Sequence, residues 1–280
     1  MVGQINTISI IGTGYLGKQI IEKSLLYNYN VKAYDINKED LDAFTADMKL
    51  KIKKEGLNAD ITPHYILSEA VKDADLIIEA VPEKLELKRE IFSQIDKVAA
   101  VHAIIATNSS SIPISKIEDV VQRRDKVLNI HFYDLFKMPI ADIMRGTQTS
   151  EETFKQGKSW LESIEITPLE VKKECYGFVM NRIWRAIKKD CLKIWADGHA
   201  DIETVDKAWR IFCQFFIETN YGPFNFMDRI GLDVVFDIEM SYFKNSGFSD
   251  DKPPNELKEM VERGELGVKT GKGFYNYESK

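Results

Sequence analysis

The stretch Ile8–Asp35 constrains the fold more than any other part of this chain. It contains an apolar strand, the glycine turn Gly12-Thr13-Gly14-Tyr15-Leu16-Gly17, a helical segment and a second short apolar strand that ends on Asp35. In such a unit the first glycine permits the tight turn, the second lets the backbone approach a pyrophosphate, and the third lets the helix pack close to the strand. The start of the helix presents free N–H groups to the phosphates. We therefore expect a dinucleotide site built from Gly12, Gly14, Tyr15, Leu16 and Gly17.

Asp35 predicts which dinucleotide is bound. A carboxylate about 20 residues after the glycine turn accepts hydrogen bonds from the ribose hydroxyls of an adenosine. The same charge repels a 2′-phosphate, and Ile36-Asn37 supply no arginine to hold one. The sequence therefore predicts NAD as the cofactor in preference to NADP.

Length and charge exclude several classes of protein. The chain has 280 residues, a net charge of −6 and a pI near 5.4, which argues against general binding to nucleic acid or to an anionic membrane. No apolar run approaches membrane-spanning length, and the N-terminus shows no signal-peptide pattern. The three cysteines form no CxxC pair and no histidine lies at metal-ligand spacing from them. We expect a cytoplasmic protein with free thiols and no metal.

Strands and helices alternate through the first part of the chain. Helical patterns cover 36–55 and 83–99 and follow Ser150, residues 58–63 read as a connection, and strands are expected at 75–81, 103–107, 127–130, 140–144 and 168–171. This alternation predicts a Rossmann-type, doubly wound α/β sheet over residues 1–172.

The remaining part of the chain, residues 173–280, has a different pattern. Long helical patterns cover 177–197, 201–216 and 231–243, with no convincing strand among them. We expect an all-α C-terminal domain that serves substrate binding and dimerisation, with its long apolar faces forming a homodimer.

Polar side chains follow two of the predicted strands. Asn108-Ser109-Ser110-Ser111 come directly after 103–107, and His131-Phe132-Tyr133-Asp134 come after 127–130. In a doubly wound sheet the ligand lies beyond the carboxyl ends of the strands, so these side chains are placed for chemistry.

With these stretches in view, the chain resembles the L-3-hydroxyacyl-CoA dehydrogenase family from end to end. The matching motifs are Gly12–Gly17 with Asp35, Glu79-Ala80-Val81-Pro82-Glu83 with Lys88, Thr107–Ser111, His131-Phe132-Tyr133, Gly177–Arg182, Gly222-Pro223-Phe224 leading to Gly231-Leu232-Asp233, and Lys269–Tyr275. Any one of them can arise by chance, whereas all of them in the same order are specific.

The resemblance implies roles for four catalytic residues. His131 matches the base that takes the proton of a substrate hydroxyl while hydride leaves the same carbon. The family holds this histidine with a glutamate a dozen or so residues downstream; here the stretch is shorter by a residue and Asp142 falls in register. Ser110 and Asn181 match the hydroxyl and the amide that bind the substrate oxygen. The alternatives are a histidine that merely caps a strand and, for Asp142, a surface acid.

On the cofactor side, the resemblance places Glu83 and Lys88 near the nicotinamide ribose. The backbone of Ala80 and Val81 passes beside the cofactor, and Asn108 belongs to the same group of cofactor-binding positions. For Lys88 a solvated helix face is the alternative.

The chain departs from the family in three places. The stretch between Asp35 and Glu79 is shorter than the family's, which carries there a helical arm over the CoA adenosine; Lys51 and Lys54 either replace part of that arm as a phosphate site or form a solvated helix end. Asp134-Leu135 replaces the usual Asn-Pro, which adds a negative charge beside the base and repels an anionic substrate. The aromatic run at 211–220 is longer than the family's short turn, and either reshapes the acyl pocket or dimer contact or is core.

Three functions are compatible with these residues. The first is an NAD-dependent dehydrogenase that interconverts an L-3-hydroxyacyl-CoA and its 3-ketoacyl-CoA, which the serines at 110–111, the Asn181 loop and the lysines favour. The second is a dehydrogenase of a free 3-hydroxy acid, as in the L-gulonate and carnitine dehydrogenases, which the shortened arm favours. The third is a cofactor-binding protein with little catalysis.

Overall fold

The computed structural model describes residues 5–277, which form two compact units that divide between Lys188 and Lys189. This division falls inside helix α6 (Met180–Ala196), whereas the functional boundary predicted from the sequence lies between residues 172 and 173. No helix in the described part of the chain is both long and apolar enough to cross a membrane.

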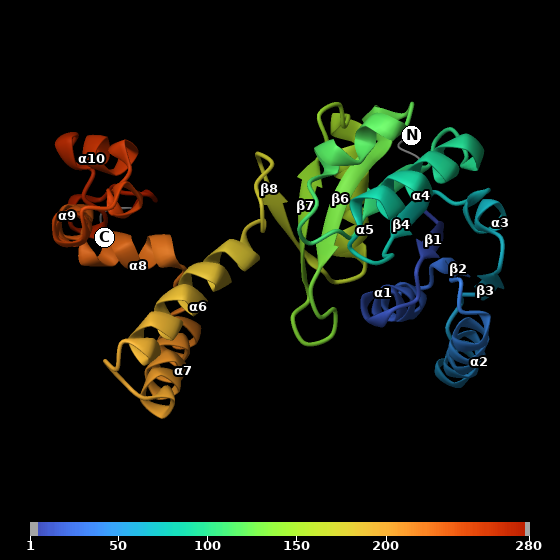
Figure 1. The fold of residues 1–280 in the computed structure, drawn as a ribbon, viewed down its shortest axis with the longest axis horizontal. Helices are drawn as coiled ribbons and strands as arrows, with labels where there is room; N and C mark the ends of the chain where they lie inside the picture. Colours follow the sequence, from blue (N-terminus) through green and yellow to red (C-terminus); the bar gives the residue numbers. More distant parts are fainter. Residues whose placement is uncertain (1–4, 278–280) are drawn as a thin grey trace. The chain divides into compact units, whose positions relative to one another are not determined.

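The first unit is built on one eight-stranded sheet (Figure 1). Its spatial order is β3-β2-β1-β4-β5-β6-β7-β8, and all neighbours pair in parallel except β6 and β7, which are antiparallel. The strands are β1 (Thr7–Ile11), β2 (Asn30–Tyr34), β3 (Ile61–His64), β4 (Leu76–Glu79), β5 (Ile104–Thr107), β6 (Val127–Phe132), β7 (Ile140–Arg145) and β8 (Thr167–Val171). The prediction of a mostly parallel, Rossmann-type sheet is confirmed.

Helices cover both faces of this sheet because its strands are apolar on both sides. Ile8 and Ile10 of β1 face one core, which also receives side chains of α1 (Tyr15–Leu26), α2 (Lys38–Glu55) and α5 (Glu151–Ser163). Ile11 faces the opposite core, together with side chains of α3 (Leu67–Val71) and α4 (Leu85–Val98). The period-2 alternation of a strand thus divides one apolar run between two layers.

Strand β3 was missed in the sequence, where the expectation that residues 58–63 form a connection was wrong. Ile61–His64 pair in parallel with β2, and Ile61 is fully buried. Pro63 has no N–H to donate, which obscured the strand in the sequence; at the edge of the sheet that loss is tolerated.

The order of the strands creates a crevice at one point of the sheet. From β1 the chain continues to β2 and β3 on one side and then returns with β4 on the other side of β1. The helices that follow β1 and β4 therefore diverge, and the carboxyl ends of these two strands are left open to a ligand.

The second unit is helical, as predicted. It contains α7 (Ile202–Thr219), α8 (Pro223–Ile230), α9 (Leu232–Ser246) and α10 (Asn255–Glu262), of which α8 and α10 were not identified from the sequence. The aromatic run at 211–220, which is longer than the family's short turn, forms the last turns of α7, and Asn220 ends this helix in the left-handed conformation (φ 53°). Within this unit Phe215 and Phe216 contact Phe226 of α8.

Asp228 ties the end of the described chain to this unit. Its carboxylate is fully buried and accepts hydrogen bonds from the N–H groups of Phe274 (2.9 Å) and Tyr275 (3.0 Å) and from the hydroxyl of Tyr277 (2.9 Å). A Cβ on Gly273 would overlap this carboxylate, so the close approach requires glycine there.

Candidate active site

Of the three glycines in the turn after β1, the fold requires Gly12 and Gly17 but not Gly14. Gly12 has a φ of 103°, and a Cβ there would lie 2.7 Å from the carbonyl oxygen of Ala80; a Cβ on Gly17 would overlap the carbonyl oxygen of Gly12. Gly14 has an ordinary φ of −67°, and a Cβ there would meet nothing within 4 Å. The space beside Gly14 is therefore open to a ligand.

The start of α1 is suited to an anion. Gly14 is its N-cap and supplies no side-chain hydrogen bond, and the first turn contains no acidic residue. The N–H groups of the first turn have no partners within the helix, and the helix dipole adds positive potential there.

A cleft of about 480 Å³ extends from this turn along the carboxyl ends of β1, β2 and β4. It is mainly apolar, and Asp35 is its acidic residue. Asp35 Oδ2 accepts from the backbone N–H (2.6 Å) and the hydroxyl (3.0 Å) of Thr13, and Oδ1 accepts from the N–H of Asn37 (2.9 Å). The lining residues are Gly12, Gly14, Tyr34, Asp35, Ile36, Ala80, Val81, Pro82, Leu87 and Ile91.

An apolar cleft that contains one anchored carboxylate beside an open glycine fits the adenosine and pyrophosphate of NAD. Of the predicted cofactor positions, Gly12, Gly14, Asp35, Ala80 and Val81 line it directly.

Lys88 lies in a buried ion pair and not on a solvated helix face. Its side chain is 1% exposed, and Nζ lies 2.8 Å from Glu79 Oε1, 3.2 Å from the carbonyl oxygen of Val81 and 3.3 Å from Glu83 Oε2. Burial raises the pKa of Glu79, and the charge and hydrogen bond of Lys88 oppose that rise. The sequence reasoning missed the role of Glu79, although an acid inside the apolar run 76–81 was a signal that it needed a buried cation.

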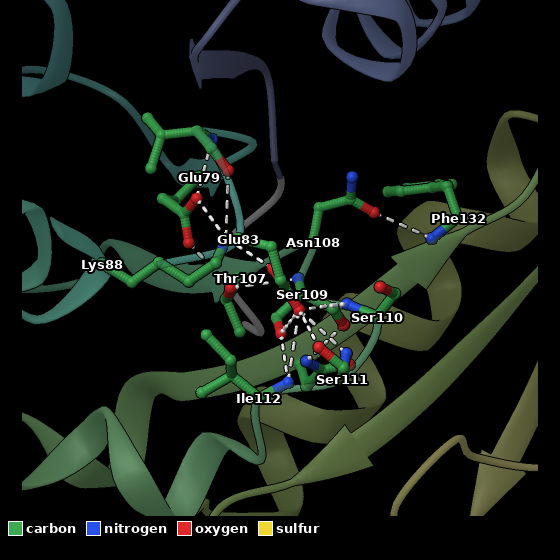
Figure 2. A network of polar contacts seen from close by, with 12 residues as sticks. Glu79, Glu83, Lys88, Thr107, Asn108, Ser109, Ser110, Ser111, Ile112 and Phe132 are labelled. Carbon is green, nitrogen blue, oxygen red and sulfur yellow. Dashed lines mark hydrogen bonds and ion pairs between the residues drawn. The ribbon is translucent and has the colours of Figure 1, made fainter. Parts of the chain in front are cut away.

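Glu83 holds the serine loop that follows β5 (Figure 2). Its Oε1 accepts from the hydroxyls of Ser109 (2.6 Å) and Ser111 (2.8 Å) and from the N–H groups of Ser110 (3.2 Å), Ser111 (2.9 Å) and Ile112 (3.2 Å). Burial raises the pKa of Glu83, but the serine hydrogen bonds and the Lys88 charge outweigh it and lower the pKa to about 2. An ionised Glu83 thus fixes the backbone that carries Ser110.

Two hydrogen bonds join this serine loop to β6. Asn108 Oδ1 accepts from the N–H of Phe132 (2.9 Å), as Figure 2 shows, and Asn129 Nδ2 donates to the carbonyl oxygen of Ser109 (3.2 Å). They place Ser110, which is exposed, at the edge of the sheet where β6 ends.

At that end of β6, His131 and Asp142 are paired across two strands. The antiparallel register of β6 and β7 sets the two residues directly opposite each other. His131 Nδ1 lies 3.3 Å from Asp142 Oδ2, and Asp142 is fully buried, so it is not a surface acid. The shorter side chain and shorter connection still bring the predicted pair into contact.

Two aromatic rings hold the imidazole of His131. Tyr133 meets it edge-on at 4.6 Å between centroids, and Phe178 stacks on it at 5.2 Å and 18°. Phe178 has a φ of 51° and follows Gly177, whose φ is 81°. A bulky residue adopts this region only under strain, and such strain is often found at functional sites.

Other predicted residues have different surroundings. Asn181 is half-buried in the first turn of α6, and its backbone forms a hydrogen bond with Tyr133. Lys51 forms ion pairs with Glu22 (2.6 Å) and Glu55 (3.7 Å), and the exposed Lys54 lies on the same helix. Neither lysine lines the cofactor cleft.

Asp134 is a turn residue as well as a charge near the base. Its Oδ1 accepts from the N–H groups of Lys137 (2.9 Å) and Phe136 (3.1 Å), and Oδ2 accepts from the hydroxyl of Tyr15 (3.0 Å). The backbone hydrogen bond from Lys137 and the Tyr15 hydroxyl lower the pKa of Asp134. These donors favour the ionised form of Asp134, so the negative charge expected from the sequence is retained.

The parallel sheet, the glycine turn, the anchored acid and the cleft at the strand reversal together define an NAD-dependent oxidoreductase. Residues 7–175 match the family model of the 3-hydroxyacyl-CoA dehydrogenase NAD-binding domain, and residues 177–277 match that of the C-terminal domain. The chain belongs to the 3-hydroxyacyl-CoA dehydrogenase family, and the resemblance seen in the sequence is confirmed.

Among its relatives, a 3-hydroxybutyryl-CoA dehydrogenase of Clostridioides difficile is 30% identical over 282 residues, covering 96% of this chain and 99% of the relative. The crystal structure of a 3-hydroxyacyl-CoA dehydrogenase of Archaeoglobus fulgidus has a TM-score of 0.83 at 26% identity, covering 98% of this chain and 93% of the other. A diketoreductase described as acting on dicarbonyl compounds has a TM-score of 0.68 at 32% identity, covering 98% and 100%.

Proposed function

We propose that this protein interconverts an L-3-hydroxyacyl-CoA and the corresponding 3-ketoacyl-CoA, with His131 as the general base and acid. The observation that carries the proposal is the buried His131–Asp142 pair at the end of β6, beside the serine loop that carries Ser110. A protein that only bound the cofactor would have no need to keep this pair.

The chemistry follows from which nitrogen of His131 is held. With its proton on Nδ1 directed to Asp142, the imidazole leaves Nε2 free to take the proton of the substrate hydroxyl. The cleft beside Gly12, Gly14 and Asp35 would hold NAD, which would supply the acceptor for the hydride that leaves the same carbon. In the reverse direction the Ser110 hydroxyl and the Asn181 amide stabilise the oxyanion that develops on the ketone.

A free 3-hydroxy acid is the second candidate substrate. Lys51 is already ion-paired with Glu22 and Glu55, which leaves it less available to a CoA phosphate.

A panel of substrates distinguishes these candidates. NADH consumption is followed with acetoacetyl-CoA, acetoacetate and longer free 3-oxo acids, with NADPH as the cofactor control. Turnover confined to the thioester supports the acyl-CoA proposal, whereas turnover confined to free acids replaces it with the second candidate. Tight NADH binding without turnover on any of them contradicts both and revives a cofactor-binding role.

The His131→Ala variant tests the role of the base. It should lose about 10²–10⁴-fold in turnover, because general acid–base catalysis contributes a factor of that size, and should keep its affinity for NADH. His102→Ala is the matched control, since that imidazole is exposed and its Nε2 lies 2.9 Å from Asp75 Oδ1, outside the site. A His131→Ala enzyme within a few-fold of wild type contradicts the mechanism.

We also propose that a second copy of this chain covers the apolar side chains of α6 and α7. Neither helix buries a single residue, and large side chains stand exposed on both, among them Trp184 (48%), Trp195 (53%) and Phe212 (49%). Exposed apolar surface of this extent is typical of an oligomer interface. The cytoplasmic location expected from the sequence stays a prediction.

A further inference from the structure

The hydroxyl of Tyr133 is the nearest hydrogen-bond partner of the Asp142 carboxylate. Tyr133 Oη lies 2.6 Å from Asp142 Oδ2, whereas His131 Nδ1 lies 3.3 Å from the same oxygen. The other oxygen, Oδ1, is 3.4 Å from the N–H of Val179. Asp142 is therefore held primarily by a tyrosine and only secondarily by the histidine that it is expected to orient.

Burial makes this contact important. Asp142 is fully buried, and a carboxylate out of water needs strong donors to replace its lost hydration and to fix its orientation. Burial, followed by the hydrogen bond to Asp142, raises the pKa of the Tyr133 hydroxyl, so the phenol keeps its proton and stays a donor at any ordinary pH.

Tyr133 also contacts the imidazole itself. Its ring meets His131 edge-on, whereas the ring of Phe178 stacks on the imidazole. One side chain thus touches both members of the pair, through its ring on His131 and through its hydroxyl on Asp142.

We propose that Tyr133 is a positioning residue: its hydroxyl fixes the Asp142 carboxylate in the orientation that receives Nδ1 of His131, so that Nε2 stays directed to the substrate. The proposal rests on the proposed function, in which His131 is the base. It adds a third side chain to the pair that the family pattern predicts.

The Tyr133→Phe variant removes the hydroxyl and keeps the ring contact with His131. Turnover should fall about 10-fold, the effect of losing one hydrogen bond to a charged group, while the KM for substrate and the affinity for NADH stay within about two-fold. Tyr29→Phe is the matched control, because it removes a hydroxyl that forms a bond of the same length, 2.6 Å, to Ser163 outside the site.

A double-mutant cycle shows whether Tyr133 acts through Asp142. In an Asp142→Asn background the further change Tyr133→Phe should cost little, because the carboxylate that it positions is gone. A full additional 10-fold loss in that background would mean that the hydroxyl acts on the substrate, and would overturn the proposal. Turnover of Tyr133→Phe within two-fold of wild type would overturn it as well.

A spectroscopic readout is independent of activity. The chain has four histidines, so the ring N–H proton of His131 can be assigned by its loss in His131→Gln in the NMR spectrum. This resonance should shift or broaden in Tyr133→Phe and stay unchanged in Tyr29→Phe. If no substrate is turned over but the resonance shifts, the proposed function fails and the positioning contact stands; if substrate is turned over and the resonance is unchanged in Tyr133→Phe, only the positioning role fails.

Discussion

Alanine substitutions in the glycine turn should separate folding from cofactor binding within one motif. Gly14→Ala adds a Cβ that meets nothing in the protein within 4 Å and keeps an allowed φ of −67°. Alanine is a poorer N-cap than glycine by about 0.5–1 kcal/mol, and it lowers the entropy of the unfolded chain by a similar amount, about 0.4–1 kcal/mol. The two effects oppose each other, so the free energy of unfolding should change by less than about 1 kcal/mol.

The same Cβ enters the space that we assign to the pyrophosphate. We expect the Kd for NADH to rise at least about 10-fold, which corresponds to about 1.4 kcal/mol. Gly12→Ala is the comparison: a left-handed φ of 103° costs an alanine about 1–2 kcal/mol, and its Cβ would lie 2.7 Å from the carbonyl oxygen of Ala80, which adds about 1–3 kcal/mol.

Urea unfolding measures stability and NADH fluorescence titration measures binding for both variants. A Gly14→Ala protein that is as stable as wild type and binds NADH equally well would show that the cofactor does not approach this turn. A loss of several kcal/mol in its stability would refute the steric reasoning instead.

Two further predictions concern charge and assembly. Glu83 has a pKa of about 2 against an ordinary value of 4.5, so the stability that it contributes is complete above about pH 4.5 and is lost as pH falls toward 2. Glu83→Gln should therefore lower the free energy of unfolding by about 1–2 kcal/mol at neutral pH, after allowance for the screening of a side chain that is 35% exposed. This difference in stability from wild type should disappear in acid. A gap that is the same in urea unfolding at about pH 7 and about pH 3 would contradict the role given to the ionised carboxylate. Light scattering should give twice the chain mass of 32.2 kDa, and Trp195→Glu should reduce it to one chain; a wild-type protein that stays a monomer at high concentration would rule out the proposed dimer.

The parts of the fold that were predicted correctly depend on local sequence. Glycine spacing and apolar periodicity can be recognised from residues that are close together in the sequence. The same is true of the helix cap at Ser150, whose hydroxyl accepts from the N–H of Thr153. Asp142 was predicted from the family resemblance, as the acid at the position of the family's glutamate; the antiparallel register of β6 and β7 sets it opposite His131.

The parts that were missed depend on pairing between distant segments. Glu79 acquires its role from Lys88 and from Thr107, whose hydroxyl lies 2.7 Å away on the next strand. The sequence does not distinguish Tyr133 from other aromatic residues, because its hydrogen bond to Asp142 depends on the pairing of β6 with β7. Phe178 lies far along the chain from His131, and its left-handed backbone leaves no pattern in the sequence.

The hydrogen bonds from residues 274–277 to Asp228 have a consequence for synthesis. Asp228 lies in α8, the helix that is synthesised directly after α7. The donors to its carboxylate, Phe274, Tyr275 and Tyr277, are synthesised much later. While the ribosome still holds those residues, Asp228 has water as its partner, and the unit cannot close around it without an unsatisfied buried charge. The sheet, in contrast, has its last strand at Val171 and a further buried core residue at Phe178, so it can fold once these residues have emerged. The two units therefore mature at different times, and a nascent chain interrupted before residue 274 presents a finished sheet attached to an open helical unit.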